Sequence, residues 1–207
     1  MHYLLTSQQF ADEMNASLPP GAPSITPRKV ASWVECGLIR DFSTSKRAGF
    51  RPEDVDAFIG SHPYKVLPFE YLRVSLVEMR PDQIQLPRNG SLATYRTHAG
   101  YDGANHLGLT TDMARRAITS IWPVAESRAR GLADRKVPLI GTVKGAVELG
   151  MAYTIVDYTR HEGRTIFHTS PAQEDVIFAI GTGALIDVPA GQIAEIVTPE
   201  LAASTSV

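Results

Sequence analysis

Apolar residues recur at helical spacing in three short stretches of the N-terminal part of the chain, within positions 1–62, and each stretch has its own start signal. The first starts at Thr6, which forms a capping-box pattern with Gln9. The second starts at Thr26, which precedes a proline at the first helical position, and it ends at Gly37. The third starts at Pro52, has acidic residues in its first turn, and stops at Gly60. The apolar faces of these helices consist of Phe10, Ala11 and Met14, then Val30, Trp33 and Val34, then Val55, Phe58 and Ile59.

The segments between the three helices follow a different pattern. Residues 17–24 contain three prolines and a glycine, which predicts a loop. Residues 38–50 are polar and lack a helical period, so they are interpreted as two short strands around a turn at 45–47. The order is therefore helix, loop, helix, two-stranded wing, helix.

Beyond a proline-containing linker at residues 63–70 the pattern changes to mixed helix and strand. We expect a strand at 71–79, a loop-rich stretch at 81–108, and a helical pattern over 110–135 that Pro123 kinks or restarts. A hairpin is expected from 152–158 and 165–169, and further strands at 176–180, 184–188 and 193–197. The predicted fold class is α+β: a domain of three helices and a two-stranded wing at 1–62, then a mixed helix/antiparallel-sheet domain at 71–197 and a tail at 198–207.

Composition and charge add one informative feature. The 207 residues carry 20 Lys+Arg and 22 Asp+Glu, a net charge of −2, and the single cysteine cannot build a disulfide framework. Residues 24–51 hold six basic and two acidic side chains, a local charge of +4 within an otherwise acidic chain. No apolar stretch is long enough for a bilayer span and the N-terminus lacks a secretory pattern, so we expect a cytoplasmic protein without membrane contact.

The basic stripe coincides with the second helix and the wing. An α-helix fits the major groove, where its side chains reach base edges, and a basic β-ribbon can contact phosphates. Trp33 and Cys36 are expected in the core, and Arg40 is expected either at a phosphate or paired with Asp41. The candidate DNA-binding residues are Thr26, Arg28, Lys29, Ser32, Arg40, Ser43, Thr44, Lys46, Arg47 and Arg51.

The same ordered residues resemble a known family. Leu5-Thr6, Thr26-Pro27-Arg28-Lys29-Val30, Gly37-Leu38-Ile39 and Arg51-Pro52-Glu53-Asp54-Val55 are similar to the winged helix-turn-helix of the MerR/excisionase superfamily. The resemblance extends from the N-terminus to Ile59 and implies DNA binding; the loop before Thr26 is longer than the tight turn usual in the family. Residues 70–207 show no such resemblance.

The second domain leaves several interpretations open. Its densest polar cluster, residues 96–106, contains His98, Asp102 and His106, which could bind a metal or form an acid–base pair, but such a segment is more often a polar loop. The domain could instead assemble a dimer through the apolar face of 110–135, with Ile118, Ile121, Trp122 and Leu132, or that face could pack within its own domain. A binding site for a small-molecule or protein effector is a further alternative.

The sequence therefore predicts a sequence-specific DNA-binding protein, a transcription regulator acting as a dimer on double-stranded DNA, and hence a nucleoid-associated location in the cytoplasm. The alternatives are an excisionase-like architectural or phage or plasmid DNA-maintenance protein, and an enzyme or ligand-binding domain that the head recruits to DNA. It indicates no catalytic residue, no metal site and no cofactor, with activity in the 96–106 region as the alternative to that expectation.

Overall fold

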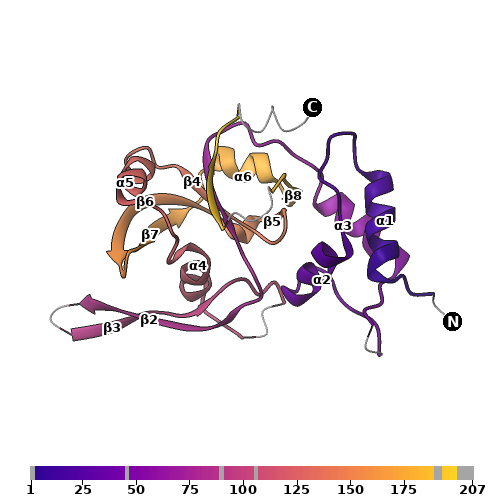
Figure 1. Cartoon of the computed structure of the whole chain (residues 1–207), viewed down its shortest axis with the longest axis horizontal. Coiled ribbons are helices and arrows are strands. Elements are labelled where there is room, and N and C mark those ends of the chain that lie inside the picture. Colours follow the sequence, from indigo (N-terminus) through magenta and orange to yellow (C-terminus); the bar gives the residue numbers. More distant parts are fainter. Residues whose placement is uncertain (1–2, 45–46, 89–90, 105–106, 189–192, 200–207) are drawn as a thin grey trace.

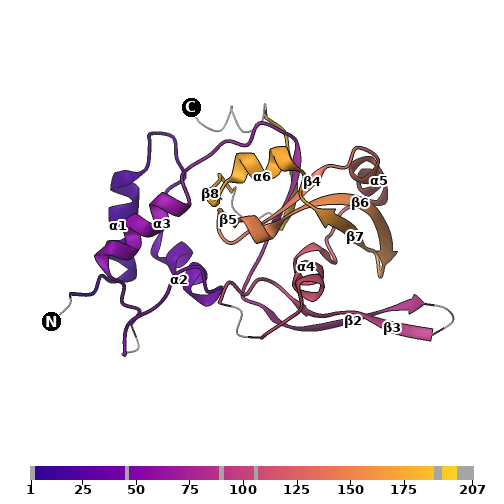
Figure 2. The same cartoon turned by 180° about the vertical axis from the view of Figure 1, so that it is seen from behind.

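The computed structural model describes residues 3–44, 47–88, 91–104, 107–188 and 193–199 (Figures 1 and 2). Three helices, α1 (Ser7–Ser17), α2 (Pro27–Glu35) and α3 (Pro52–Ser61), pack at one end of the molecule and are called the head (residues 3–62). The remaining residues form a mixed α+β body, from which a long β-hairpin projects (Figure 1). The mixed α+β class is as predicted.

The cap signals place the three head helices correctly. Thr6 and Gln9 form the capping box, and the Thr26 hydroxyl accepts the backbone N–H of Lys29 at 3.3 Å. At α3 the Asp54 carboxylate accepts the backbone N–H of Arg51 at 2.9 Å. The helix runs through Ser61 to a C-cap at His62, so the predicted stop at Gly60 is wrong by one residue.

Aromatic rings fill the space between the head helices. Phe10 meets Phe50 edge-on with ring centroids 5.0 Å apart, and Trp33 lies 4.7 Å from Phe58. All four side chains are buried. Trp33 and Cys36 therefore lie in the core, as the sequence predicts.

The wing (residues 38–50) does not contain the two predicted strands in its described part. The backbone N–H of Phe42 donates to Gly49 O at 2.9 Å, and Phe50 forms an isolated bridge with Leu5. The Asp41 carboxylate accepts the backbone N–H groups of Ser43 and Gly49, at 2.8 and 2.9 Å. A side chain that takes backbone amides in this way holds a turn-rich loop in place of a regular ladder.

The body is built on a five-stranded sheet in the order β7-β6-β4-β1-β9. Its strands are β1 (Tyr71–Ser75), β4 (Pro138–Thr142), β6 (Ala152–His161), β7 (Arg164–Pro171) and β9 (Ala194–Val197). β1 and β4 are parallel, and the other pairs are antiparallel. A small second sheet pairs β5 (Ala146–Glu148) with β8 (Gly183–Leu185), and the 3-10 turn η1 (Leu149–Met151) leads into β6. The hairpin predicted at 152–169 is confirmed.

The stretch 81–108, predicted as loop-rich, contains instead the two longest strands after β6. β2 (Arg80–Arg88) and β3 (Ser91–Ala99) pair antiparallel and form the projecting hairpin, called the arm (Figure 1). Polar residues occupy both faces of the arm, so the alternation that marks a half-buried strand is absent from its sequence. The dipeptide Asn89-Gly90 between the strands was the available hairpin signal.

Residues 176–180 are also not the strand that their apolar run suggested. They belong to α6 (Glu174–Ile180), in which Val176 and Ile180 are buried and Phe178 is exposed. Buried residues four apart with exposed ones between them follow the helical period, and Glu174 and Asp175 supply the acidic first turn.

Pro123 separates two helices, α4 (Thr111–Thr119) and α5 (Glu126–Asp134), so the restart alternative holds. Between them Trp122 exchanges two backbone hydrogen bonds with Thr165, at 2.8 and 2.9 Å. Ile118, Trp122 and Leu132 are buried in the chain's own core. These three side chains are therefore unavailable as the face that joins two copies.

The head is docked against the body along several contacts. The Trp33 indole Nε1–H donates to Val143 O at 2.7 Å, and the backbone N–H of Gly103 donates to Cys36 O at 2.8 Å. Within the connecting segment Lys65 N donates to Leu185 O at 2.8 Å, and Leu67 is buried. One cluster of buried side chains runs through head and body without interruption.

Candidate nucleic-acid interface and the adjoining groove

The predicted reading face of α2 is only partly exposed. Thr26 and Arg28 are exposed, whereas Lys29 and Ser32 are partly buried. The Thr26 hydroxyl already caps the helix through the Lys29 N–H. The outward edge of α2 therefore consists of Arg28, Ala31 and Glu35. The sequence analysis did not single out Ala31 or Glu35.

Lys29 turns toward the body and away from solvent. Its Nζ donates to Ser24 O at 2.7 Å. Burial lowers the pKa of its ammonium; Lys144 also lowers it and the Asp187 carboxylate opposes the shift. Lys29 thus acts at the junction of head and body rather than as a free reading side chain.

Two arginines, Arg40 in the wing and Arg51 directly after it, lie over one phenylalanine ring. The guanidinium of Arg51 lies 4.0 Å from the centroid of the Phe42 ring, and that of Arg40 lies 4.9 Å from it. Both arginines are exposed at the surface. Cation–π contacts at exposed sites stabilise the position of a guanidinium by about 0.5–1 kcal/mol each, so both positive charges are held beside the ring. Phe42 was missed from the sequence, although an aromatic residue between two arginines was the available signal.

The other wing residues have mixed positions. Thr44 and Arg47 are exposed, and Ser43 is partly buried with its N–H on Asp41. Although slight burial works the other way, the Gly49 and Ser43 amides hold the pKa of the Asp41 carboxyl below its usual range. This carboxylate is engaged by the backbone and Arg40 contacts Phe42, so of the two alternatives for Arg40 the pair with Asp41 is not the one formed. Lys46 lies outside the described residues.

Cys36 is buried beneath the C-terminal end of α2. Burial raises the pKa of its thiol to about 12, with Glu35 adding to the shift. A thiol protonated at neutral pH is a weak nucleophile, which agrees with the packing role predicted for it.

The polar cluster at 96–106 does not converge in its described part. His98 Nδ1 lies 2.9 Å from the hydroxyl of Thr97, and the Asp102 carboxylate accepts Leu107 N–H at 3.2 Å. Tyr101 donates to Glu148. His106 lies outside the described residues. Across the described part of the chain, no three His, Cys, Asp or Glu side chains gather in a way that could hold a metal ion.

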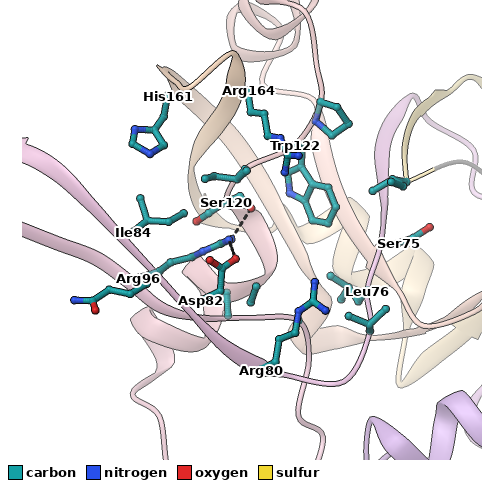
Figure 3. Close-up of a pocket in the computed structure, with 18 of the residues that line it drawn as sticks. Ser75, Leu76, Arg80, Asp82, Ile84, Arg96, Ser120, Trp122, His161 and Arg164 are labelled. Atoms are coloured by element: carbon teal, nitrogen blue, oxygen red, sulfur yellow. Dashed lines mark hydrogen bonds and ion pairs between the residues drawn. The ribbon is translucent and has the colours of Figure 1, made fainter.

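A groove of about 1570 Å³ separates the start of α2 from the arm and the sheet (Figure 3). Its walls come from seven separate parts of the chain: the start of α2, the segment from β1 into β2, the end of β3, the end of α4 with the turn after it, Lys144 after β4, the β6–β7 turn, and Val188 with Ile193 before β9. Six lining residues are Arg or Lys and two are Asp or Glu. The groove is therefore positively charged within a chain whose net charge is −2.

Arg80 and Arg164 extend into the groove from opposite sides, with the Trp122 ring between them (Figure 3). Both are exposed, and neither guanidinium has an ion-pair or hydrogen-bond partner among the described residues. Trp122 is buried and its Nε1–H is held by Ile118 O at 3.2 Å.

Arg96 forms the deep end of the groove. Its side chain is only 4% exposed, donates to the Asp82 carboxylate, and donates through Nη1 to Ser120 O at 2.7 Å. Burial lowers the pKa of its guanidinium and Asp82 opposes that shift. Its Nε is buried without a hydrogen-bond partner in the described structure.

Comparisons with protein-family models, with curated proteins and with solved structures find no match to this chain. Among the helices of the described residues, none has the length and apolar character needed to cross a membrane.

Proposed function

We propose that this chain binds duplex DNA through the outward edge of α2 and the wing, and that it acts as a transcription regulator. The observation that carries the proposal is the Arg40–Phe42–Arg51 stack on the exposed wing. Cations held in advance at a surface suit phosphate contacts, which position a protein on DNA without reading its sequence.

In this proposal Arg28 is the residue that contacts base edges. Arg28 is exposed in the first turn of α2, and a nine-residue helix about 13 Å long fits the major groove. Arg is the usual partner of the guanine O6 and N7 atoms. Glu35 at the other end of the edge disfavours close approach of phosphate there, so the N-terminal half of α2 is the half expected to enter the groove.

The test is selection of bound sequences from a random duplex library with the purified full chain. An enriched consensus is the expected result; a palindrome would show that two heads bind paired half-sites, as expected for a dimer. Absence of enrichment would refute sequence-specific binding.

Arg28→Ala then tests the reading role on the selected duplex. This substitution should weaken binding to the selected duplex by about 1–3 kcal/mol and should weaken binding to a random duplex far less. The matched control is Arg128→Ala, an exposed arginine on α5. Equal loss on both duplexes would reassign Arg28 to a phosphate contact.

A second candidate function, an architectural role in bending DNA, is favoured by the arm. The strands of the arm contain one acidic side chain, Asp82, which is paired with Arg96, and the arm projects from the body (Figure 2). Near its far end Pro87 and Leu92 are paired and exposed, and apolar side chains on such ribbons can wedge between base steps. Energy transfer between dyes at the two ends of a bound duplex should show bending that Leu92→Ser reduces; a straight duplex would refute the architectural role.

A further inference from the structure

We propose that the groove beside α2 binds a small anion with a flat, apolar body, held by Arg80 and Arg164 against the Trp122 ring. The inference concerns a ligand site separate from the wing, and only its regulatory consequence rests on the proposed DNA-binding function.

No interaction among the described residues explains the positive charge that Arg80 and Arg164 bring to the groove. Arg80 and Arg164 are exposed to the solvent of the groove, so a ligand can reach both guanidiniums. Arg80 and Arg164 point into one space with no partner among the described residues, while the neighbouring Arg96 is paired with Asp82. Two guanidiniums that line one groove can each form charge-assisted hydrogen bonds with a carboxylate, which makes an anion the favoured ligand.

The walls define the rest of the ligand. Ile84 and Trp122 are buried apolar side chains that line the groove (Figure 3). A site with an apolar wall and a few convergent charged groups is the usual design of a small-molecule pocket. The unpartnered Nε of Arg96, at the deep end, adds one donor for an acceptor atom on the ligand.

The burial of the groove's deep end favours a small ligand over a duplex. Arg96 and Trp122 are 4% and 9% exposed, which leaves too little accessible surface for a phosphate on the outside of a duplex to contact them. The groove also includes Thr26, Arg28 and Lys29 at the start of α2. If α2 reads DNA as proposed, an anion in the groove shares Arg28 with the duplex and lowers DNA affinity, which makes the site regulatory.

The two tryptophans give a direct measurement on the full-length chain without DNA. Trp122 lines the groove and Trp33 lies in the head core, so their indole N–H signals in a ¹⁵N spectrum report separately. Titration with 2-naphthoate should shift the Trp122 signal saturably at one molecule per chain. The matched neutral probe, 2-naphthamide, should bind at least tenfold more weakly, and so should inorganic phosphate, which lacks the flat body.

Arg80→Gln and Arg164→Gln should each lower the affinity for 2-naphthoate at least tenfold, whereas the control Arg128→Gln should leave this affinity unchanged. Equal binding of the amide, or unchanged binding in both groove variants, would overturn the proposal. A short single-stranded oligonucleotide is a further probe: if it shifts the Trp122 signal and 2-naphthoate does not, the groove is a nucleic-acid channel and the proposal is wrong.

The regulatory consequence is tested separately, by measuring affinity for the selected duplex with and without saturating 2-naphthoate. Weaker DNA binding in the wild type but not in Arg164→Gln is the expected result. Unchanged DNA affinity alongside confirmed naphthoate binding would overturn the regulatory consequence and leave the ligand site standing. Failure to bind any duplex would overturn the proposed function alone.

Discussion

Replacing Trp33 by Phe should loosen the head from the body. The indole is fully buried, and its Nε1–H donates to Val143 O across the junction at 2.7 Å. Loss of this hydrogen bond costs about 0.5–1.5 kcal/mol. Loss of the two indole carbons absent from phenylalanine costs roughly 0.8 kcal/mol for each buried group. The free energy of unfolding should therefore fall by about 2–3 kcal/mol.

We expect the loss in the free energy of unfolding to lie at the low end of that range, because the acceptor of the indole N–H keeps another hydrogen bond. Val143 O also accepts the backbone N–H of Ala146 at 3.0 Å, so it is not left unpaired when the indole is removed. Urea unfolding followed by circular dichroism gives the magnitude. Trp122→Phe is the control, because its indole bond to Ile118 O, at 3.2 Å, lies inside the body.

Proteolysis under native conditions distinguishes the effect of Trp33→Phe at the junction from that of Trp122→Phe inside the body. Trp33→Phe should speed cleavage within residues 62–69, while Trp122→Phe should not, because only Trp33 spans the junction. A loss smaller than that of a single ordinary hydrogen bond, about 0.5 kcal/mol, together with unchanged cleavage would refute the argument that this bond holds the head in place.

Three further perturbations test the junction, the buried histidine and the wing. Gly37→Ala should destabilise the chain by about 2–4 kcal/mol in urea unfolding, because φ is +72° and the new Cβ would lie 2.6 Å from Ala104 N; Gly60→Ala, with open space around it, is the control that should lose nothing. Burial lowers the pKa of His62, so the folded state binds fewer protons than the unfolded one, and the free energy of unfolding should fall as pH drops below about 6.5; the fall should be smaller in His62→Phe but unchanged in His161→Gln. The double change Arg40→Gln and Arg51→Gln should reduce the slope of log K against log salt by about 1.8 if both contact phosphate, and an unchanged slope would show that the stack faces away from DNA.

Local signals were sufficient to predict the head helices. Thr6 with Gln9 and Thr26 before Pro27 are side-chain cap patterns that act within one turn, so sequence and structure carry the same information there. The burial of Trp33 follows from its place opposite Arg28 on the same short helix.

Elements whose form depends on distant contacts were mispredicted. The arm has polar residues on both faces, and its contact with the body is made mainly by α4, a separate element further along the chain. In the wing, the Asp41 carboxylate accepts two backbone N–H groups, which favours a turn-rich loop over two paired strands. The periodicity of the sequence carries no signal for these two hydrogen bonds. The run 176–180 fits either period, and only the burial of Val176 and Ile180 decides between them.

The groove was beyond prediction from the sequence for a similar reason. Arg80 and Arg164 lie far apart in the sequence and on different elements, and the stretches between them include the whole arm and two helices. Neither residue belongs to a motif. They line the same groove because β1 pairs parallel with β4, which places the arm beside the β6–β7 turn.

The docked head changes how a two-part chain of this kind can recognise DNA. A head on a free linker can choose its own approach to a duplex, and the body then only adds affinity by bringing a second head nearby. Here Trp33 and Cys36 tie α2 to the body, and the connecting segment pairs with Leu185. A duplex that engages Arg28 must therefore also accommodate the arm and the body in fixed positions. On the proposed function, specificity then depends on which DNA shapes fit this rigid outline as much as on the bases that Arg28 can reach.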